Sequence, residues 1–307
     1  MNYLHGKLFP KFWEAVEAMD KCCEIDKHVL AKSEVYNETW MLRLTLARIY
    51  DYDRKEFKVD EPKNAALKKI RDAVRKCWIS EGGLEPAFEK EGTTWTDAIL
   101  GDVTIGEYDD GDGDKRKVKF DDKGNKGPTS VVIIEAKMGS SLSKSVTNSA
   151  DYDQAARNIA CLSKLLLEAG KESGAFFVFM PDSSRHNLRT HNFSEAEKFI
   201  SNAITTIQAQ NKDREISIAK DSKKPIAKRN YCLATTHQNQ IEKFSEIVKH
   251  ISKNQSMVLT WDEIIDSMYD TEDKTLGIKS DTEKLRTFYE KALDEIRKQT
   301  TTSMRNA

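Results

Sequence analysis

The stretch SVVIIEAKMG, residues 130–139, contains the strongest strand signal in the chain and, directly after it, a pair of opposite charges. The four consecutive β-branched residues at 131–134 predict a strand that is buried on both faces. Glu135 and Lys137 follow while the strand should still be running. Because side chains two residues apart in a strand point to the same face, we expect the carboxylate and the ammonium side by side. Charges at the end of an apolar strand cost free energy unless a partner holds them there, and a divalent cation suits a carboxylate.

The composition is that of a soluble globular protein. The 307 residues are enough for one large domain or two smaller ones, and the 32% of charged residues imply a broad polar surface. The formal net charge of −1 excludes a strongly basic nucleic-acid-binding protein, so any nucleic-acid surface has to be a local patch. No apolar run is long enough for a membrane span and no signal-peptide pattern is present, so we expect a cytoplasmic protein without membrane association. The five cysteines lack CxxC spacing, which predicts reduced thiols.

Hydrophobic periodicity divides the chain into three regions. Residues 1–80 and 241–307 have the spacing of amphipathic helices, whereas residues 81–240 alternate between strand and helix signals. The first region ends in a helix predicted from 64 to 78, which Gly82 and Gly83 would terminate. The order of elements predicts an α/β fold with helical additions at both ends.

The central region contains the elements that flank the stretch at 130–139. Segment 93–106 is a strand candidate, and segment 175–182 is a second buried strand. Between the central stretch and this second strand lies an amphipathic helix, which Asn148 or Ser149 would cap and Gly170 would end. Short strands are also possible further on, at 214–220 and 231–236.

Segment 93–106 carries a carboxylate that can meet Glu135. Consecutive strands joined by a loop usually pair antiparallel, which would bring Asp97 beside Glu135 at one end of the sheet. Two neighbouring carboxylates repel each other, and a divalent metal between them removes the conflict. Asp102 is the rival first acid. Because it lies five residues further on, it would face the opposite side of a regular strand, and we favour Asp97.

An acid on one strand followed by Glu135-Ala136-Lys137 on the next resembles the PD-(D/E)XK nuclease superfamily, which has the restriction-endonuclease-like fold. The elements expected between 64 and 180 follow an order similar to the αβββαβ core of that superfamily. A glutamine recurs near the lysine in several of its families, and here Gln154 lies in the first turns of the following helix. Thr96 stands where the superfamily's motif has proline, so the match on the first strand depends on Asp97 alone.

The resemblance implies a Mg²⁺-dependent endonuclease that hydrolyses phosphodiester bonds in DNA, in restriction, repair or phage defence. Asp97, Glu135 and the backbone carbonyl of Ala136 would hold the Mg²⁺, which Mn²⁺ could replace. Lys137 would orient the attacking water or stabilise the anionic transition state, and Gln154 would position the water or the phosphate. The implied partner is DNA, double-stranded in the first instance, with RNA left open. The helical regions at both ends could form a homodimer interface or a DNA clamp.

Other interpretations stay open. A catalytically silent DNA-binding or scaffold protein could retain the same fold, although such a protein would be free to lose Asp97, Glu135 and Lys137. Glu135 and Lys137 could also form a solvated pair at a sheet edge. The five cations between Lys220 and Arg229 belong either to a solvated loop or to a surface that contacts phosphates.

Overall fold

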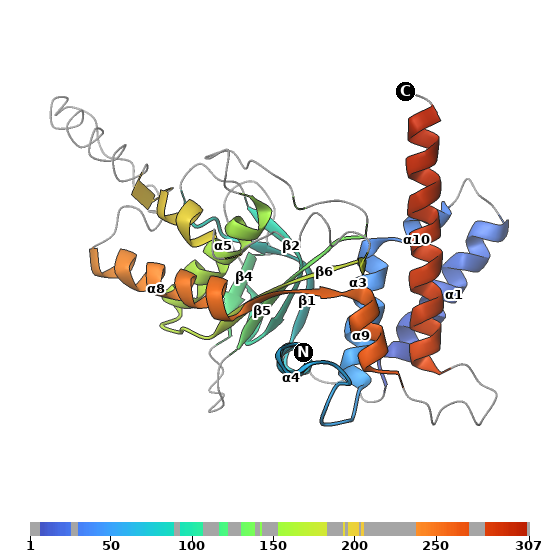
Figure 1. The fold of residues 1–307 in the computed structure, drawn as a ribbon, viewed down its shortest axis with the longest axis horizontal. Helices are drawn as coiled ribbons and strands as arrows, with labels where there is room; N and C mark the ends of the chain where they lie inside the picture. Colours follow the sequence, from blue (N-terminus) through green and yellow to red (C-terminus); the bar gives the residue numbers. More distant parts are fainter. Residues whose placement is uncertain are drawn as a thin grey trace.

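The structure is a computed structural model. The described residues are 7–25, 30–88, 93–106, 117–121, 130–138, 142, 153–182, 193, 196–202, 204–205, 238–269 and 280–305. Within these ranges the chain forms one mixed sheet with helices on both faces (Figure 1), which confirms the expected mixed α/β class. The basic segment 220–229 and the strands predicted at 214–220 and 231–236 lie outside the described residues.

Seven strands in the described part of the chain build the sheet, in the order β3-β4-β1-β2-β5-β6-β7. The strands are β1 (Trp78–Leu84), β2 (Thr94–Gly101), β3 (Val103–Gly106), β4 (Lys117–Phe120), β5 (Val131–Ala136), β6 (Gly174–Met180) and β7 (Ser256–Thr260). β2 pairs antiparallel with β1 and with β5, whereas β5, β6 and β7 are parallel to one another. β5 therefore has a neighbour on each side, which explains its unbroken apolar run.

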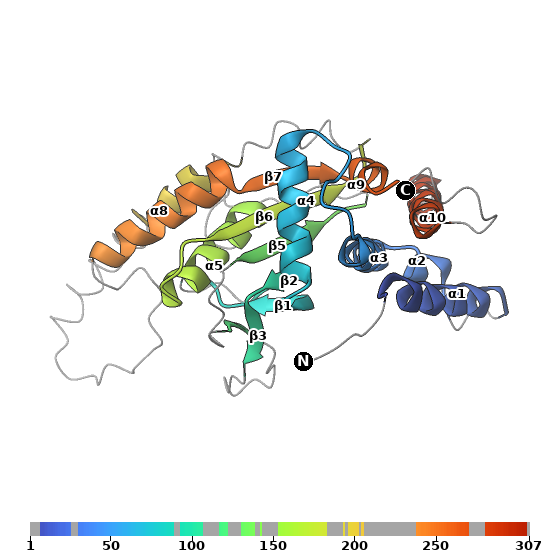
Figure 2. The same cartoon turned by 90° about the horizontal axis from the view of Figure 1, so that it is seen from below.

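Helices cover the two faces of the sheet in separate groups (Figure 2). On one face α3 (Glu38–Asp51), α4 (Glu61–Val74) and α9 (Trp261–Ser267) contact the sheet. The helices α1 (Phe9–Ile25), α2 (Lys32–Val35) and α10 (Asp281–Arg305) extend the same core cluster beside α3. The other face packs against α5 (Gln154–Glu168) and α8 (Gln238–Asn254). Strand β5 serves both layers, because Val132 and Ile134 point to the first face while Val131 and Ile133 point to the second.

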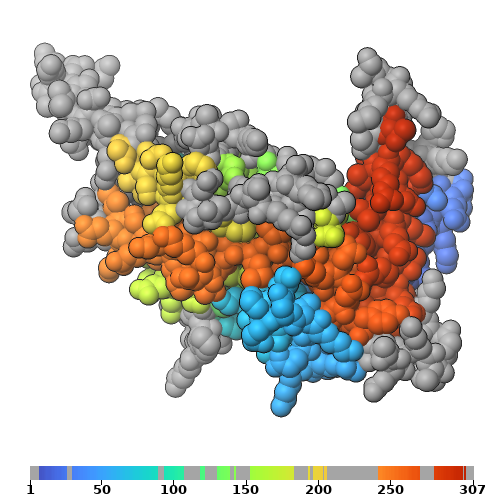
Figure 3. Space-filling model, in the orientation of Figure 1, coloured from blue at the N-terminus to red at the C-terminus, as the bar shows by residue number. Residues whose placement is uncertain are grey.

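The last part of the chain crosses the molecule. From α8 it passes through β7 into α9 and α10, as the orange and red atoms of Figure 3 show. Because α10 packs beside α3, helices from the two ends of the chain share one layer. No helix in the described part of the chain combines the length and the apolarity that crossing a membrane requires.

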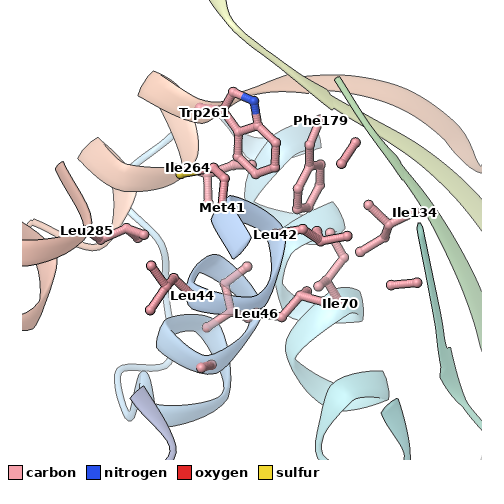
Figure 4. Packing of buried hydrophobic residues seen from close by; sticks show 14 of the residues in the cluster. Met41, Leu42, Leu44, Leu46, Ile70, Ile134, Phe179, Trp261, Ile264 and Leu285 are labelled. Carbon is pink, nitrogen blue, oxygen red and sulfur yellow. The ribbon is translucent and has the colours of Figure 1, made fainter. Parts of the chain in front are cut away.

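The core of the first face joins the sheet to these helices. In Figure 4, Leu42 of α3 lies toward Ile134 of β5 and Phe179 of β6, whereas Leu44 lies toward Leu285 of α10. The buried ring of Trp261 at the start of α9 lies against Phe179, with the ring centroids 5.2 Å apart and an interplanar angle of 83°. Edge-to-face aromatic packing of this kind is favourable beyond the area it buries.

Two strands differ from the sequence-based expectation. The helix predicted from 64 to 78 ends at Val74, and Trp78–Leu84 forms β1, so Gly82 and Gly83 lie in a strand and do not terminate a helix. The helical description of 241–307 is wrong at Ser256–Thr260, which adds β7 beside β6. Both segments are short, and pairing with β2 or β6 outweighs their weak local signals.

The helix after the central strand begins later than predicted. Neither Asn148 nor Ser149 caps it, because α5 starts at Gln154 and the carboxylate of Asp153 accepts a hydrogen bond from the Ala156 amide at 2.8 Å. This cap fixes Gln154 as the first helical residue. In α3, Asn37 plays the same part and accepts from the amide of Trp40 at 3.0 Å.

Candidate active site

In a regular strand, successive side chains alternate between the two faces of the sheet. In β1 and β2 this alternation is broken, at neighbouring positions of the two strands. In β1, Ile79 and Leu84 lie five residues apart, yet both pack in the cluster under α5, although an odd separation should place them on opposite faces. Glu81, between them, has a φ of 53°, a conformation that non-glycine residues rarely adopt. The register places Asp97 of β2 directly opposite Glu81. Strain of this kind often marks a functional site.

Strand β2 shows the same inversion. Thr94 contacts Cys161 of α5 at 3.4 Å, and Ile99, five residues on, also belongs to the cluster under α5. Asp97 lies between them, where the strand changes face. Its side chain is directed along the sheet towards β5, because Oδ2 accepts a hydrogen bond from the backbone amide of Ala136 at 2.6 Å. A side-chain oxygen thus takes the place of a backbone acceptor in the ladder between β2 and β5.

Asp97 and Glu135 meet across the two strands, as expected. Ala98 pairs with Ile134, so one step further along the same register Asp97 lies opposite Glu135. Burial raises the pKa of the Asp97 carboxyl above its ordinary value, against the hydrogen bond from Ala136. Burial, and next the charge of Asp97, raise the pKa of Glu135 to about 7.

Three donors surround the carboxylate of Glu135. The ammonium of Lys137 donates to Oε1 at 2.6 Å, and the amide of Gln154 donates to the same oxygen. Asn158, one turn further along α5 and fully buried, donates to Oε2 at 3.2 Å. The structure therefore brings together the four side chains that the sequence predicted and adds Asn158. The i, i+4 spacing from Gln154 was the signal in the sequence that could have found it.

Glu38, the first residue of α3, is the second side chain that sequence reasoning missed. Burial raises the pKa of its carboxyl, while the charge of Lys137 and a hydrogen bond from the Met138 amide act in the opposite direction. The ammonium of Lys137 thus has acidic neighbours on both faces of the sheet. Burial by itself would lower the pKa of Lys137, but attraction to Glu135, Asp97 and Glu38 raises it, so the lysine stays charged at neutral pH. No residue spacing in the sequence connects Glu38 to Lys137.

The backbone of Lys137 is held from two elements that come later in the chain. Its amide donates to the carbonyl of Phe179 on β6 at 2.8 Å, and its carbonyl accepts from the indole Nε1 of Trp261 at 3.0 Å. Both the N–H and the C=O of the lysine therefore have fixed partners where β5 ends. Trp261 belongs to α9, so the C-terminal part of the chain contributes directly to the site.

Asp102, the rival first acid, lies at the other end of β2, beyond Gly101. Its Oδ2 accepts from the ammonium of Lys76 at 3.0 Å and from the amide of Ser130 at 2.9 Å. Since Ser130 precedes β5 and Glu135 is near its end, the length of the strand separates Asp102 from Glu135. Asp102 has a structural role in joining β2 to the start of β5.

The residues present fit an incomplete magnesium site. The described residues contain no group of three or more His, Cys, Asp or Glu side chains placed to hold a metal ion. Mg²⁺ commonly takes only one or two carboxylates from the protein and fills its other positions with water and phosphate oxygens. Asp97 and Glu135 are two hard oxygen donors whose mutual repulsion a divalent cation would relieve.

The comparisons with known proteins identify no relative. No family model matches the chain, and no match was found among curated proteins or among solved structures. The geometry of the site is therefore the basis of the functional conclusion.

The raised pKa of Glu135 predicts that the metal-free protein loses stability as the pH rises. Below about pH 7 the folded state retains a proton that the unfolded state, with the ordinary glutamate pKa of 4.5, releases. The free energy of unfolding should therefore fall as the pH rises from 4.5 towards 7, by roughly 3 kcal/mol at most. Urea denaturation across this range is the measurement. Glu135→Gln should flatten the curve, and an unchanged slope in that variant would contradict the assignment.

Trp261→Phe should destabilise the protein by about 1–3 kcal/mol, because the buried Lys137 carbonyl loses its donor while the aromatic contact with Phe179 is kept. The matched control is Trp78→Phe, since the indole N–H of Trp78 is buried with no hydrogen-bond partner among the described residues. Urea denaturation of both variants measures the difference. Equal losses would show that ring volume, and not the hydrogen bond, sets the effect.

Proposed function

We propose that this chain is a metal-dependent nuclease of the PD-(D/E)XK type that hydrolyses phosphodiester bonds in DNA. The observation that carries the proposal is the meeting of Asp97, Glu135 and Lys137 at one end of β2 and β5, under the first turn of α5. The order α4-β1-β2-β5-α5-β6 supports a restriction-endonuclease-like αβββαβ core, with β3 and β4 inserted between its second and third strands.

The surroundings of the site suit an anionic substrate. Gln154 is the first residue of α5 and Glu38 is the first residue of α3, so two helix N-termini lie beside the acidic pair. The partial positive charge of a helix N-terminus favours phosphate oxygens. The charged Lys137, beside Glu135, adds a positive charge where negative charge would develop on the phosphate during the reaction.

Each side chain has a separate role in this reaction. A bound Mg²⁺, held by Asp97, Glu135 and the carbonyl of Ala136, would polarise the phosphate and make water a better nucleophile. Lys137 acts as a cation because its raised pKa keeps its proton, so it stabilises the developing negative charge and does not serve as the general base. Gln154 and Asn158 hold the two oxygens of Glu135 in a fixed orientation.

One observation favours a second candidate, a DNA-binding scaffold that does not cut. Both oxygens of Glu135 already accept hydrogen bonds from Lys137, Gln154 and Asn158. A carboxylate satisfied in this way can be a structural ion pair without any metal. Cation binding and cleavage separate the two candidates.

Glu135→Ala should abolish the binding of Mn²⁺, because it removes one of the two carboxylates that converge. Calorimetric titration is the measurement, and Asp97→Ala should have the same effect. Asp102→Asn is the matched control, since Asp102 lies at the other end of β2 beside Lys76 and should leave the affinity unchanged. Unchanged affinity in both Asp97→Ala and Glu135→Ala would remove the metal from the proposal.

Lys137→Met should slow cleavage roughly a hundred- to a thousandfold while Mn²⁺ and DNA binding stay near the wild-type level. Loss of about 3–4 kcal/mol of transition-state stabilisation lowers turnover without much change in ground-state affinity. Nicking of plasmid and cutting of linear DNA with Mg²⁺ measure cleavage, and binding is measured with Ca²⁺. A wild-type protein that binds DNA and cuts none would favour the scaffold. A Lys137→Met protein that cuts normally would exclude the lysine from the mechanism.

A further inference from the structure

Trp95 is exposed on the strand that carries Asp97. It keeps 47% of its surface accessible and is one of three large hydrophobic side chains that the described part of the chain leaves exposed. Its neighbours Thr94 and Thr96 are buried, so the alternation along β2 turns the indole outwards. Because Thr94 faces α5, Trp95 points to the opposite face of the sheet.

No paired residue covers the ring of Trp95 from the side. Its partner across β1 is Gly83, which has no side chain. On the other edge, the described pairing between β2 and β5 ends at Ala98 and Ile134, three residues beyond Trp95. Among the described residues, the indole thus stands on a part of β2 whose paired neighbours on either side do not cover it, although indoles are usually well buried.

Trp95 lies close to the acidic pair along β2. Trp95 lies two positions before Asp97, which corresponds to about 6.5 Å along a strand. Glu81, opposite Asp97, pairs with Arg43 of α3 at 3.6 Å, so a guanidinium also lies near this end of the two strands. The described pairing of β2 with β5 stops at Ala98 and Ile134, so at this end of the strands a nucleotide that adjoins a phosphate at Asp97 and Glu135 can pass to the face on which Trp95 stands.

We propose that Trp95 is a stacking platform for one unpaired nucleobase beside the scissile phosphate, and that the preferred substrate is single-stranded DNA. This inference rests on the proposed nuclease function and names its substrate class. An aromatic ring stacks on the face of any base, which gives affinity without sequence preference. In a duplex the neighbouring base pairs cover those faces, so Trp95 can bind only a base that has left the stack.

The test is the affinity of the whole chain for a fluorescently labelled thymidine 20-mer and for a duplex of the same length, measured by anisotropy with Ca²⁺ in place of Mg²⁺. Trp95→Ala should weaken binding of the single strand roughly 5- to 150-fold, the range that loss of one base–aromatic stack produces. Trp95→Phe, which keeps an aromatic face, should recover most of the affinity. Binding of the duplex should change little in either variant.

Ile105→Ala is the matched control, because Ile105 is 51% exposed on β3, away from the acidic pair, and its loss removes exposed apolar surface without an aromatic ring. It should leave the affinity for the single strand unchanged, and urea denaturation should show that all three variants are folded.

Equal affinity of wild type and Trp95→Ala for the single strand would overturn the inference, as would an equal loss on the duplex. If Glu135→Ala still abolished Mn²⁺ binding and cleavage in that case, the nuclease would stand and only the platform would fail. A wild-type protein that bound neither DNA nor Mn²⁺ would remove both.

Discussion

Asp97 and Glu135 lie opposite each other where little water reaches them, and two such carboxylates repel each other and lose hydration. The fold offsets this cost with donors from the end of β5 and from the start of α5. The amide of Ala136 reaches Asp97, while Lys137 and two side chains of α5 reach Glu135. A stable protein has little free energy to spare for an uncompensated buried charge, so these contacts restrict how β2, β5 and α5 can be arranged.

The inversion at Glu81 and Asp97 shows how the sheet accommodates this requirement. A regular β2 would direct Asp97 straight out of one face, whereas the observed strand directs it along the sheet to the Ala136 amide. The left-handed conformation of Glu81 has a cost of order 1–3 kcal/mol, which the paired strands on either side have to supply. Gly82 follows at once, and a Cβ there would lie 2.8 Å from Ile99, so a larger residue has no room beside the inversion.

Local patterns in the sequence account for much of the fold and for part of the site. The run at 131–134, the helix around Gln154 and the C-terminal helices were predicted, because their periodicity agrees with their burial. β1 and β7 were not predicted, since their signals are weak and pairing with β2 and β6 decides their conformation.

The pairing of Asp97 with Glu135 was expected from antiparallel neighbours, and the structure has it. The structure places Asp97 and not Asp102 beside Glu135, and the reason differs from the expected one, because β2 is not regular and Asp102 lies beyond its end. Glu38 and Trp261 reach Lys137 only through the tertiary fold, across 99 and 124 residues, and no local spacing encodes such contacts.

The contact of Trp261 with Lys137 has a consequence for the order of events during synthesis. The ribosome releases β2, β5 and α5 long before β7 and α9, so Lys137 emerges more than a hundred residues ahead of the indole that fixes its carbonyl. Until then β6 lacks one of its two parallel neighbours and the end of β5 lacks one of its two anchors. Domains generally complete their packing only when the contacts of highest sequence separation can close. A nascent chain would therefore carry all the acidic residues of the site without their final geometry, and the site would be completed only after α9 has emerged.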